Sequence, residues 1–150
     1  MTDELHWMSA ADMVRGFESG DFSPVEATKS VFARIHAVDG RLNCFRELNE
    51  QGALEAASQS EERWRSGNPL SPIDGVPTSI KDLFDMAGHA TRRGSKTSDA
   101  KPAEADAPNV ARLREAGAVL LGKTTTPEFG WKGITDSPLT GITRNPWNTD

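Results

Sequence analysis

Cysteine, histidine and long apolar runs are scarce in this sequence, and each scarcity excludes a class of protein. The one cysteine, Cys44, cannot form an internal disulfide and suits a reducing compartment. The three histidines, His6, His36 and His89, lack i, i+4 partners and acidic clusters beside them, which argues against a metal site. No apolar run approaches the ~20 residues that cross a bilayer, and the start lacks the basic-then-apolar order of a signal peptide. We therefore expect a cytoplasmic protein that does not enter a membrane.

Basic residues are also in the minority. Seventeen lysines and arginines stand against 22 acidic residues, and the net charge of −5 argues against nucleic-acid binding and favours a small or neutral partner. With 36% hydrophobic and 26% charged residues in 150, the chain has the composition of a soluble globular protein and the length to bury one core.

The first third of the chain carries two helix starts. Ser9 precedes an apolar stripe that ends at Gly20. Ser23-Pro24-Val25-Glu26 then places serine at the N-cap, proline at N1 and glutamate at N3, and we expect this helix to end at Gly40. A third helix follows over about residues 53–64. Two amphipathic helices in tandem indicate a helical hairpin, which packs on its own domain or against a partner.

Two stretches later in the chain have strand character. Valine, threonine and isoleucine alternate over 76–80, and 118–121 is a continuous apolar run, typical of a strand buried on both faces. A helix expected over about 108–117 lies between them, which favours a right-handed, parallel βαβ unit.

The sequence therefore predicts an α/β fold: an amino-terminal helical hairpin beside part of a mixed, largely buried sheet with helices packed on it. We expect a helical part at about 1–68 and an α/β part at about 69–150. A short strand is expected within 42–48, little regular structure over 83–106, and a compact helix start with Thr126 as its N-cap.

Lys81 and Asp82 stand at the carboxyl end of the strand expected over 76–80, where α/β proteins tend to place their chemistry. One interpretation is a solvated lysine or one paired with Asp82; the other is a partly desolvated lysine that acts as a base. Successive side chains of a strand point to opposite faces, so we predict that in the intact enzyme Lys81 faces inward and Asp82 faces away.

Residues 117–124 match the G-x-x-x-x-G-K-T pattern of phosphate-binding loops. Such a loop follows a strand and opens a helix, whereas here a helix comes first and the middle residues form an apolar strand. We therefore expect no nucleotide site, and a structural role for Lys123 at a strand end.

Several short motifs, taken together and in order, resemble the amidase signature family of serine amide hydrolases. The resemblance covers about residues 9–150 and is most specific over 72–150. Its motifs are Gly75-Val76-Pro77 with Ile80-Lys81-Asp82, Gly94-Ser95, the segment Glu115 to Thr124, Pro127-Glu128-Phe129, and Asn145-Pro146-Trp147.

The resemblance implies that Lys81 is the catalytic lysine of a Ser–cis-Ser–Lys triad that hydrolyses a linear carboxylic amide, without a metal or organic cofactor. It places Asp82, Gly94 and Ser95 near the site, although Arg92 departs from the family's Thr-Thr-x-Gly-Ser pattern. The glycine-rich turns that carry both serines in the family do not occur in these residues. We therefore expect the amino-terminal portion of a single amidase domain, inactive alone, and the intact protein could form a homodimer.

Two other functions stay open. The first is the A subunit of an aminoacyl-tRNA amidotransferase, although Thr124 to Phe129 differs from the Asn-Met-Asp-Glu-Phe typical of such proteins. The second, of another class, is a non-catalytic interaction module.

Overall fold

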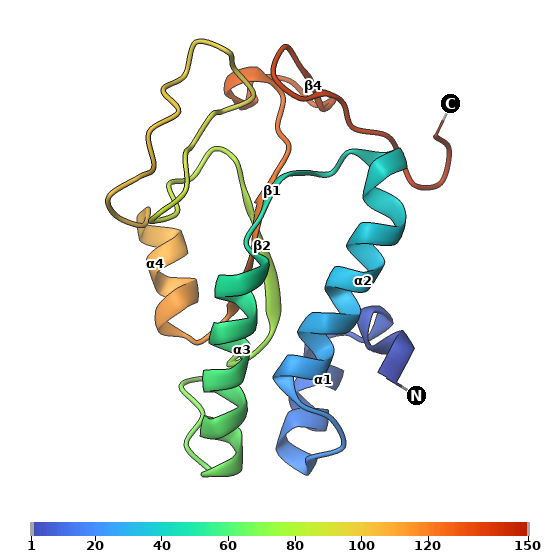
Figure 1. Cartoon of the computed structure of the whole chain (residues 1–150), viewed down its shortest axis with the longest axis vertical. Coiled ribbons are helices and arrows are strands. Elements are labelled where there is room, and N and C mark those ends of the chain that lie inside the picture. The colour runs from blue at the N-terminus through green and yellow to red at the C-terminus, as the bar shows by residue number, and fades with distance from the viewer. Residues whose placement is uncertain (1, 150) are drawn as a thin grey trace. The chain divides into compact units, whose positions relative to one another are not determined.

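The computed structural model describes residues 2–149 and has the predicted mixed α/β architecture (Figure 1). In chain order its elements are η1 (Thr2–Trp7), α1 (Ala10–Ser19), α2 (Pro24–Leu42), β1 (Phe45–Leu48), α3 (Glu50–Arg65), β2 (Pro77–Lys81), α4 (Pro108–Glu115), β3 (Val119–Thr124), η2 (Glu128–Gly130), β4 (Asp136–Ser137) and β5 (Gly141–Ile142). None of the helices found in this part of the chain is both long and apolar enough to span a bilayer.

The chain forms two compact units, and each is assembled from three separate segments. Unit 1 comprises Met1–Ala37, Asn49–Thr78 and Arg112–Leu121. Unit 2 comprises Val38–Leu48, Ser79–Ala111 and Gly122–Asp150.

The predicted helix starts are confirmed in unit 1. Ser9 caps α1 by accepting a hydrogen bond from the Asp12 amide at 3.1 Å, and Gly20 ends the helix in the left-handed conformation at φ 75°. At α2 the Ser23 hydroxyl accepts from the Glu26 amide at 3.2 Å, while the Glu26 carboxylate accepts from the Ser23 amide at 2.9 Å. These reciprocal bonds form a capping box.

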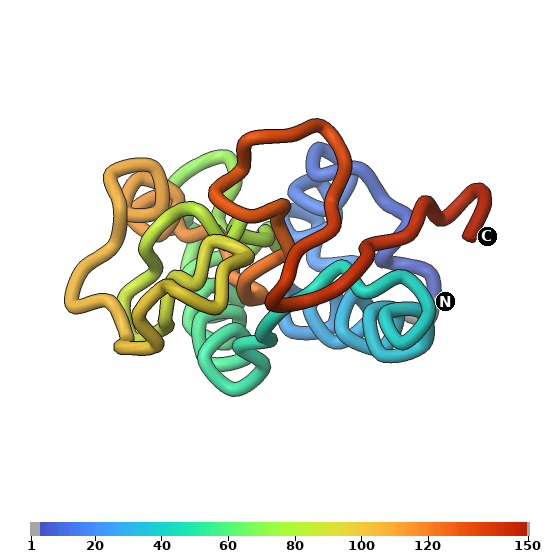
Figure 2. The backbone as a smooth tube through the Cα atoms, turned by 90° about the horizontal axis from the view of Figure 1, so that it is seen from above, coloured from blue at the N-terminus to red at the C-terminus, as the bar shows by residue number. Residues whose placement is uncertain are grey.

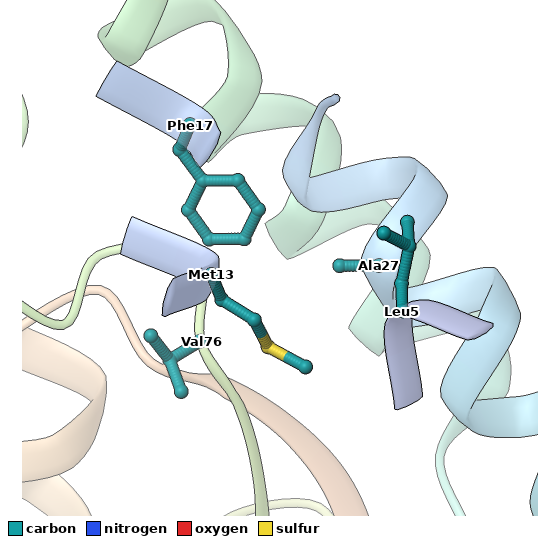
Figure 3. Packing of buried hydrophobic residues seen from close by; sticks show 5 residues of the cluster. All are labelled: Leu5, Met13, Phe17, Ala27 and Val76. Carbon is teal, nitrogen blue, oxygen red and sulfur yellow. The ribbon is translucent and has the colours of Figure 1, made fainter. Parts of the chain in front are cut away.

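The core of unit 1 confirms the helical hairpin. Met13 and Phe17 of α1 are buried against Ala27 of α2, together with Leu5 and Val76 (Figure 3). The hairpin therefore packs on its own domain, the first of the two arrangements that the sequence left open.

A buried ion pair joins α3 to the turn before β2. Asp74 has no exposed surface and accepts hydrogen bonds from Nε and Nη2 of Arg63, both at 2.7 Å, and from the Leu70 amide at 2.8 Å. Burial raises the pKa of the Asp74 carboxyl, but the Arg63 and Leu70 bonds outweigh it and leave that pKa below its ordinary value. Gly117 lies next to Asp74 and has φ 85°. A Cβ added at Gly117 would lie 2.4 Å from Asp74 Oδ1, so the close approach requires glycine.

The main sheet has the strand order β1-β3-β2. β1 and β3 are antiparallel, with Phe45 opposite Thr124 and Leu48 opposite Gly122. β2 and β3 run parallel, because their hydrogen-bonded partners rise together in number: in unit 1 the Val119 amide donates to Val76, and in unit 2 the Asp82 amide donates to Thr124. The first five residues of β3 are buried, as the apolar run predicts.

Three local expectations differ from the structure. α2 does not end at Gly40 but continues to Leu42, after which Asn43 adopts φ 57°. β3 is longer than the apolar run 118–121 and includes Lys123. The helix expected to start at Thr126 is a three-residue 3-10 turn, η2, and Pro127 is its N-cap.

Residues between β2 and α4 have little regular structure, as expected. Figure 2 traces them as an irregular path without helical coils. Isolated bridges, such as Met86 with His89 and Ala90 with Pro102, hold this segment together within unit 2.

Candidate active site

Lys81 and Asp82 lie at the carboxyl end of β2, in unit 2. They face opposite ways, as expected for successive residues of a strand, but in this chain Asp82 is the one that faces inward. The inward orientation of Lys81 is predicted for the intact enzyme and stays a prediction. Lys81 is exposed, whereas Asp82 is 1% exposed. Among the side chains that the structure describes, those of residues 4–149, the Lys81 ammonium has no hydrogen-bond or ion-pair partner, so it does not pair with Asp82.

The Asp82 carboxylate turns inward because two cations lie there. Its Oδ2 is 2.9 Å from Nε of Arg46 on β1, and its Oδ1 is 3.4 Å from Nζ of Lys123 on β3. Oδ1 also accepts a hydrogen bond from the Arg92 amide at 3.3 Å. A carboxylate in this position compensates charges that would otherwise be buried without a partner.

Lys123 is the more deeply buried of the two cations, with no exposed side-chain surface. It donates to the Phe84 carbonyl at 2.6 Å and to the Thr91 hydroxyl at 3.0 Å. Burial lowers the pKa of Lys123, and the Asp82 carboxylate partly opposes that shift. The structural role predicted for Lys123 is confirmed. Because 119–124 is a buried strand, this segment cannot wrap a phosphate.

The segment Thr91–Ser95 is anchored to the residue that follows Lys81. The Arg93 amide donates to the Asp82 carbonyl at 3.1 Å, beside the bond from the Arg92 amide to the same residue's carboxylate. Gly94 has φ 65°, and a Cβ there would lie 2.5 Å from the Thr126 carbonyl, so the position requires glycine. Gly94 and Ser95 therefore belong to a loop bonded directly to the end of β2.

The Ser95 side chain is occupied within that loop. It is fully buried, and its hydroxyl lies 2.8 Å from the Thr97 hydroxyl. This arrangement gives Ser95 a part in the loop's structure, whereas Lys81 is exposed.

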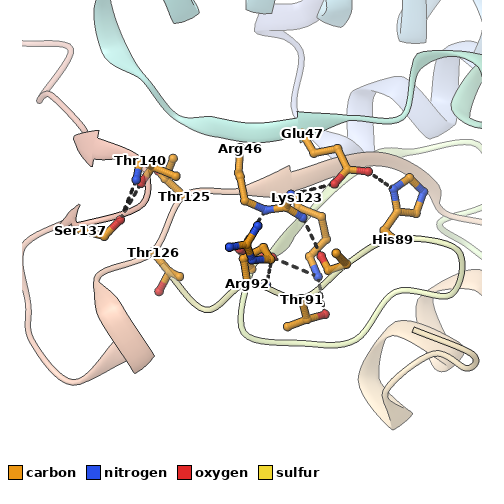
Figure 4. Close-up of polar contacts among 12 residues, drawn as sticks. Arg46, Glu47, His89, Thr91, Arg92, Lys123, Thr125, Thr126, Ser137 and Thr140 are labelled. Atoms are coloured by element: carbon orange, nitrogen blue, oxygen red, sulfur yellow. Dashed lines mark hydrogen bonds and ion pairs between the residues drawn. The ribbon is translucent and has the colours of Figure 1, made fainter. Parts of the chain in front are cut away.

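Sequence reasoning missed the residues of β1 that complete this cluster (Figure 4). Arg46 donates to the Ala90 carbonyl at 2.6 Å and pairs with Glu47 at 2.8 Å, and Glu47 also bonds His89. Burial raises the pKa of Glu47, but His89 and Arg46 together bring it below its ordinary value. The adjacent charges Arg46 and Glu47 inside a short strand were the one sign of this cluster in the local sequence. Their partners could not be identified from it, because Asp82, His89 and Ala90 lie far away along the chain.

The cluster does not have the composition of a metal centre. Among the residues that the structure describes, histidine, cysteine, aspartate and glutamate form no group of three or more suited to a metal ion.

Comparison with known proteins gives the context of this site. The chain is 38% identical over 148 residues to an acylamidase of Rhodococcus erythropolis, a match of 98% of this chain and 31% of the relative. It is 40% identical over 147 residues to the A subunit of the glutamyl-tRNA(Gln) amidotransferase of Thermobifida fusca, a match of 98% of this chain and 30% of that relative.

The chain is also similar in structure to a solved amidase. A bacterial aryl acylamidase of the amidase signature family superposes with a TM-score of 0.86 at 33% identity, over 97% of this chain and 31% of its own. The chain thus spans about a third of the length of the proteins that it matches. The family model for amidases matches residues 26–150, which include β2, its terminal lysine and the loop bonded to it. The chain therefore belongs to the amidase signature family.

Proposed function

We propose that this chain supplies the general base, Lys81, of an enzyme that hydrolyses a linear carboxylic amide to an acid and an amine or ammonia. One observation carries the proposal: in an amidase family chain, Lys81 projects from the end of β2 beside a loop bonded to the next residue. Neutral Lys81 takes a proton from the cis-serine, which takes one from the nucleophilic serine. The nucleophilic serine attacks the amide carbon, and the C–N bond breaks as the amine or ammonia leaves with the proton that Lys81 took up. Water then hydrolyses the acyl-enzyme and releases the acid.

A lysine must lose its proton to act as a base, and burial favours the neutral amine. Lys81 is exposed in this chain, and the relatives are about three times as long. The remaining portion of the domain therefore provides both the cover over Lys81 and the two serines. On this account residues 1–150 alone hydrolyse no amide above background, and no metal or organic cofactor takes part.

The test compares the chain 1–150 with the complete polypeptide translated from its coding region, on a panel of aliphatic and aryl amides. We expect turnover from the complete polypeptide only. Lys81→Ala and Lys81→Arg should each lower kcat by at least about 100-fold, because guanidinium keeps its proton. Lys96→Arg, at an exposed lysine, is the matched control. Near-normal turnover by Lys81→Arg would make Lys81 a positioning charge and refute the proton route.

The amidotransferase function stays the second candidate, because the amidotransferase relative is as similar to this chain as the acylamidase is. A complete polypeptide that releases ammonia only with glutamyl-tRNA(Gln) and partner subunits would favour it. Turnover of simple amides without nucleic acid or membrane would favour the amidase, a cytoplasmic enzyme with a small-molecule partner. A coding region that stops at residue 150, with no activity, would leave the interaction module.

A further inference from the structure

We propose that Asp82 is a positioning residue for Lys81: it fixes the end of β2 and the loop at 91–95 to each other, and so sets where the catalytic amine stands. This inference rests on the proposed function of Lys81 as the base. It adds a role for the adjacent carboxylate, which is buried and points away from Lys81.

Asp82 bonds the backbone of two other segments, β3 and the loop at 91–95. Its amide donates to the Thr124 carbonyl at 3.1 Å, which ties the end of β2 to the end of β3. Its carbonyl accepts from the Arg93 amide at 3.1 Å and its carboxylate from the Arg92 amide at 3.3 Å. One residue thus bonds the neighbouring strand and the loop, directly after Lys81. The Lys81 carbonyl is fixed in turn by the amides of Leu83 and Phe84, at 2.7 and 3.1 Å.

The charge of Asp82 is also held in place by two largely buried cations. The carboxylate lies between Arg46 of β1 and Lys123 of β3, and the side chains of these two residues are 14% and 0% exposed. If the carboxylate moved, it would leave buried cations without an anion, which is strongly unfavourable. The ionic contacts therefore restrain the Asp82 side chain. Asp82 in turn restrains the backbone at the end of β3 and in the loop at 91–95.

Unit 1 offers a matched control. Asp74 is a second fully buried aspartate paired with an arginine, and it also accepts a backbone amide bond. Replacing it removes the same kind of interaction without touching the end of β2. Asp82→Asn and Asp74→Asn should both destabilise the protein, and only Asp82→Asn should affect Lys81.

The experiment uses the complete polypeptide with two measurements. The first is kcat per active site, with sites counted by the burst of the acyl-enzyme step, so that unfolded molecules do not count. We expect Asp82→Asn to lower kcat per site at least about 10-fold with KM changed less than about twofold, because positioning a base affects the chemical step. Asp74→Asn should lower the number of sites and leave kcat per site unchanged.

The second measurement is hydrogen exchange of the amides at 91–95, which does not require activity. Asp82→Asn should speed exchange there at least about 10-fold, and Asp74→Asn should not. If Asp82→Asn does not fold, Asp82→Glu keeps the charge but displaces the carboxylate, and the same loss of kcat per site is expected.

The outcomes separate the two proposals. Unchanged kcat per site in an active enzyme, or unchanged exchange at 91–95, would overturn the role of Asp82. A wild-type polypeptide that hydrolyses no amide would refute the proposed function, and the exchange result would still decide whether Asp82 fixes the loop.

Discussion

Removing the guanidinium of Arg63 should destabilise the chain strongly at neutral pH and much less in acid. Arg63→Met keeps most of the side-chain volume but leaves Asp74, which has no exposed surface, without its cation. Two hydrogen bonds of 2.7 Å are lost, and the Leu70 amide still donates to the carboxylate at 2.8 Å.

The magnitude follows from burial. Breaking a buried ion pair by removing one partner costs about 3–5 kcal/mol, because the other charge stays in a poorly polar site. The free energy of unfolding of a small domain is about 5–15 kcal/mol, so this loss is a large fraction of its stability. Arg63→Lys, which keeps a charge but not the bidentate geometry, should lose less, about 1–3 kcal/mol.

The pH dependence has a definite sign. The folded-state pKa of Asp74 lies below its unfolded value, so the pair's contribution is present above the ordinary carboxyl range and is lost as pH falls through the folded pKa. In Arg63→Met, burial without the cation favours the protonated acid. The difference in free energy of unfolding between wild type and Arg63→Met is therefore largest at pH 7 and becomes smaller as the pH falls.

Urea unfolding followed by circular dichroism at several pH values measures this difference. Arg65→Met is the matched control on the same helix, because Arg65 pairs with Glu61 at the surface and such pairs contribute about 0–1 kcal/mol. A loss below about 1 kcal/mol for Arg63→Met, or a loss that does not depend on pH, would refute the assignment of a buried, charged pair.

Three further predictions concern other parts of the chain. Trp131 and Trp147 are 77% and 93% exposed, so we expect residues 1–150 to bind a hydrophobic dye or to associate. Replacing both tryptophans with serine should reduce dye binding and association, and a wild-type monomer that binds no dye would contradict the prediction. Gly122→Ala should destabilise by at least about 2 kcal/mol in urea unfolding, because a Cβ would lie 2.2 Å from a β1 carbonyl, whereas Gly133→Ala, which meets nothing, should have little effect. ATP or GTP with magnesium should leave the Tm unchanged because Lys123 is buried, and a saturable increase would show a nucleotide site.

The sequence predicted much of the local structure, because short-range interactions decide it. Ser9 and the Ser23–Glu26 capping box begin their helices where side-chain and backbone groups three residues apart can bond. Gly40 shows the limit of such reasoning. A glycine costs a helix about 1 kcal/mol, and here the helix continues to Leu42, whose carbonyl accepts a bond from the distant Arg144 amide.

For the site, the sequence by itself determined the lysine at the end of β2, the alternation that sends Lys81 and Asp82 to opposite faces, and the loop at 91–95. Only the tertiary structure decided which of the two faces is buried. That choice depends on Arg46 and Lys123, which reach Asp82 from two other strands, and no local pattern encodes their approach. The backbone conformation follows from neighbours in sequence, whereas the burial of a charge follows from where its compensating charges lie in space.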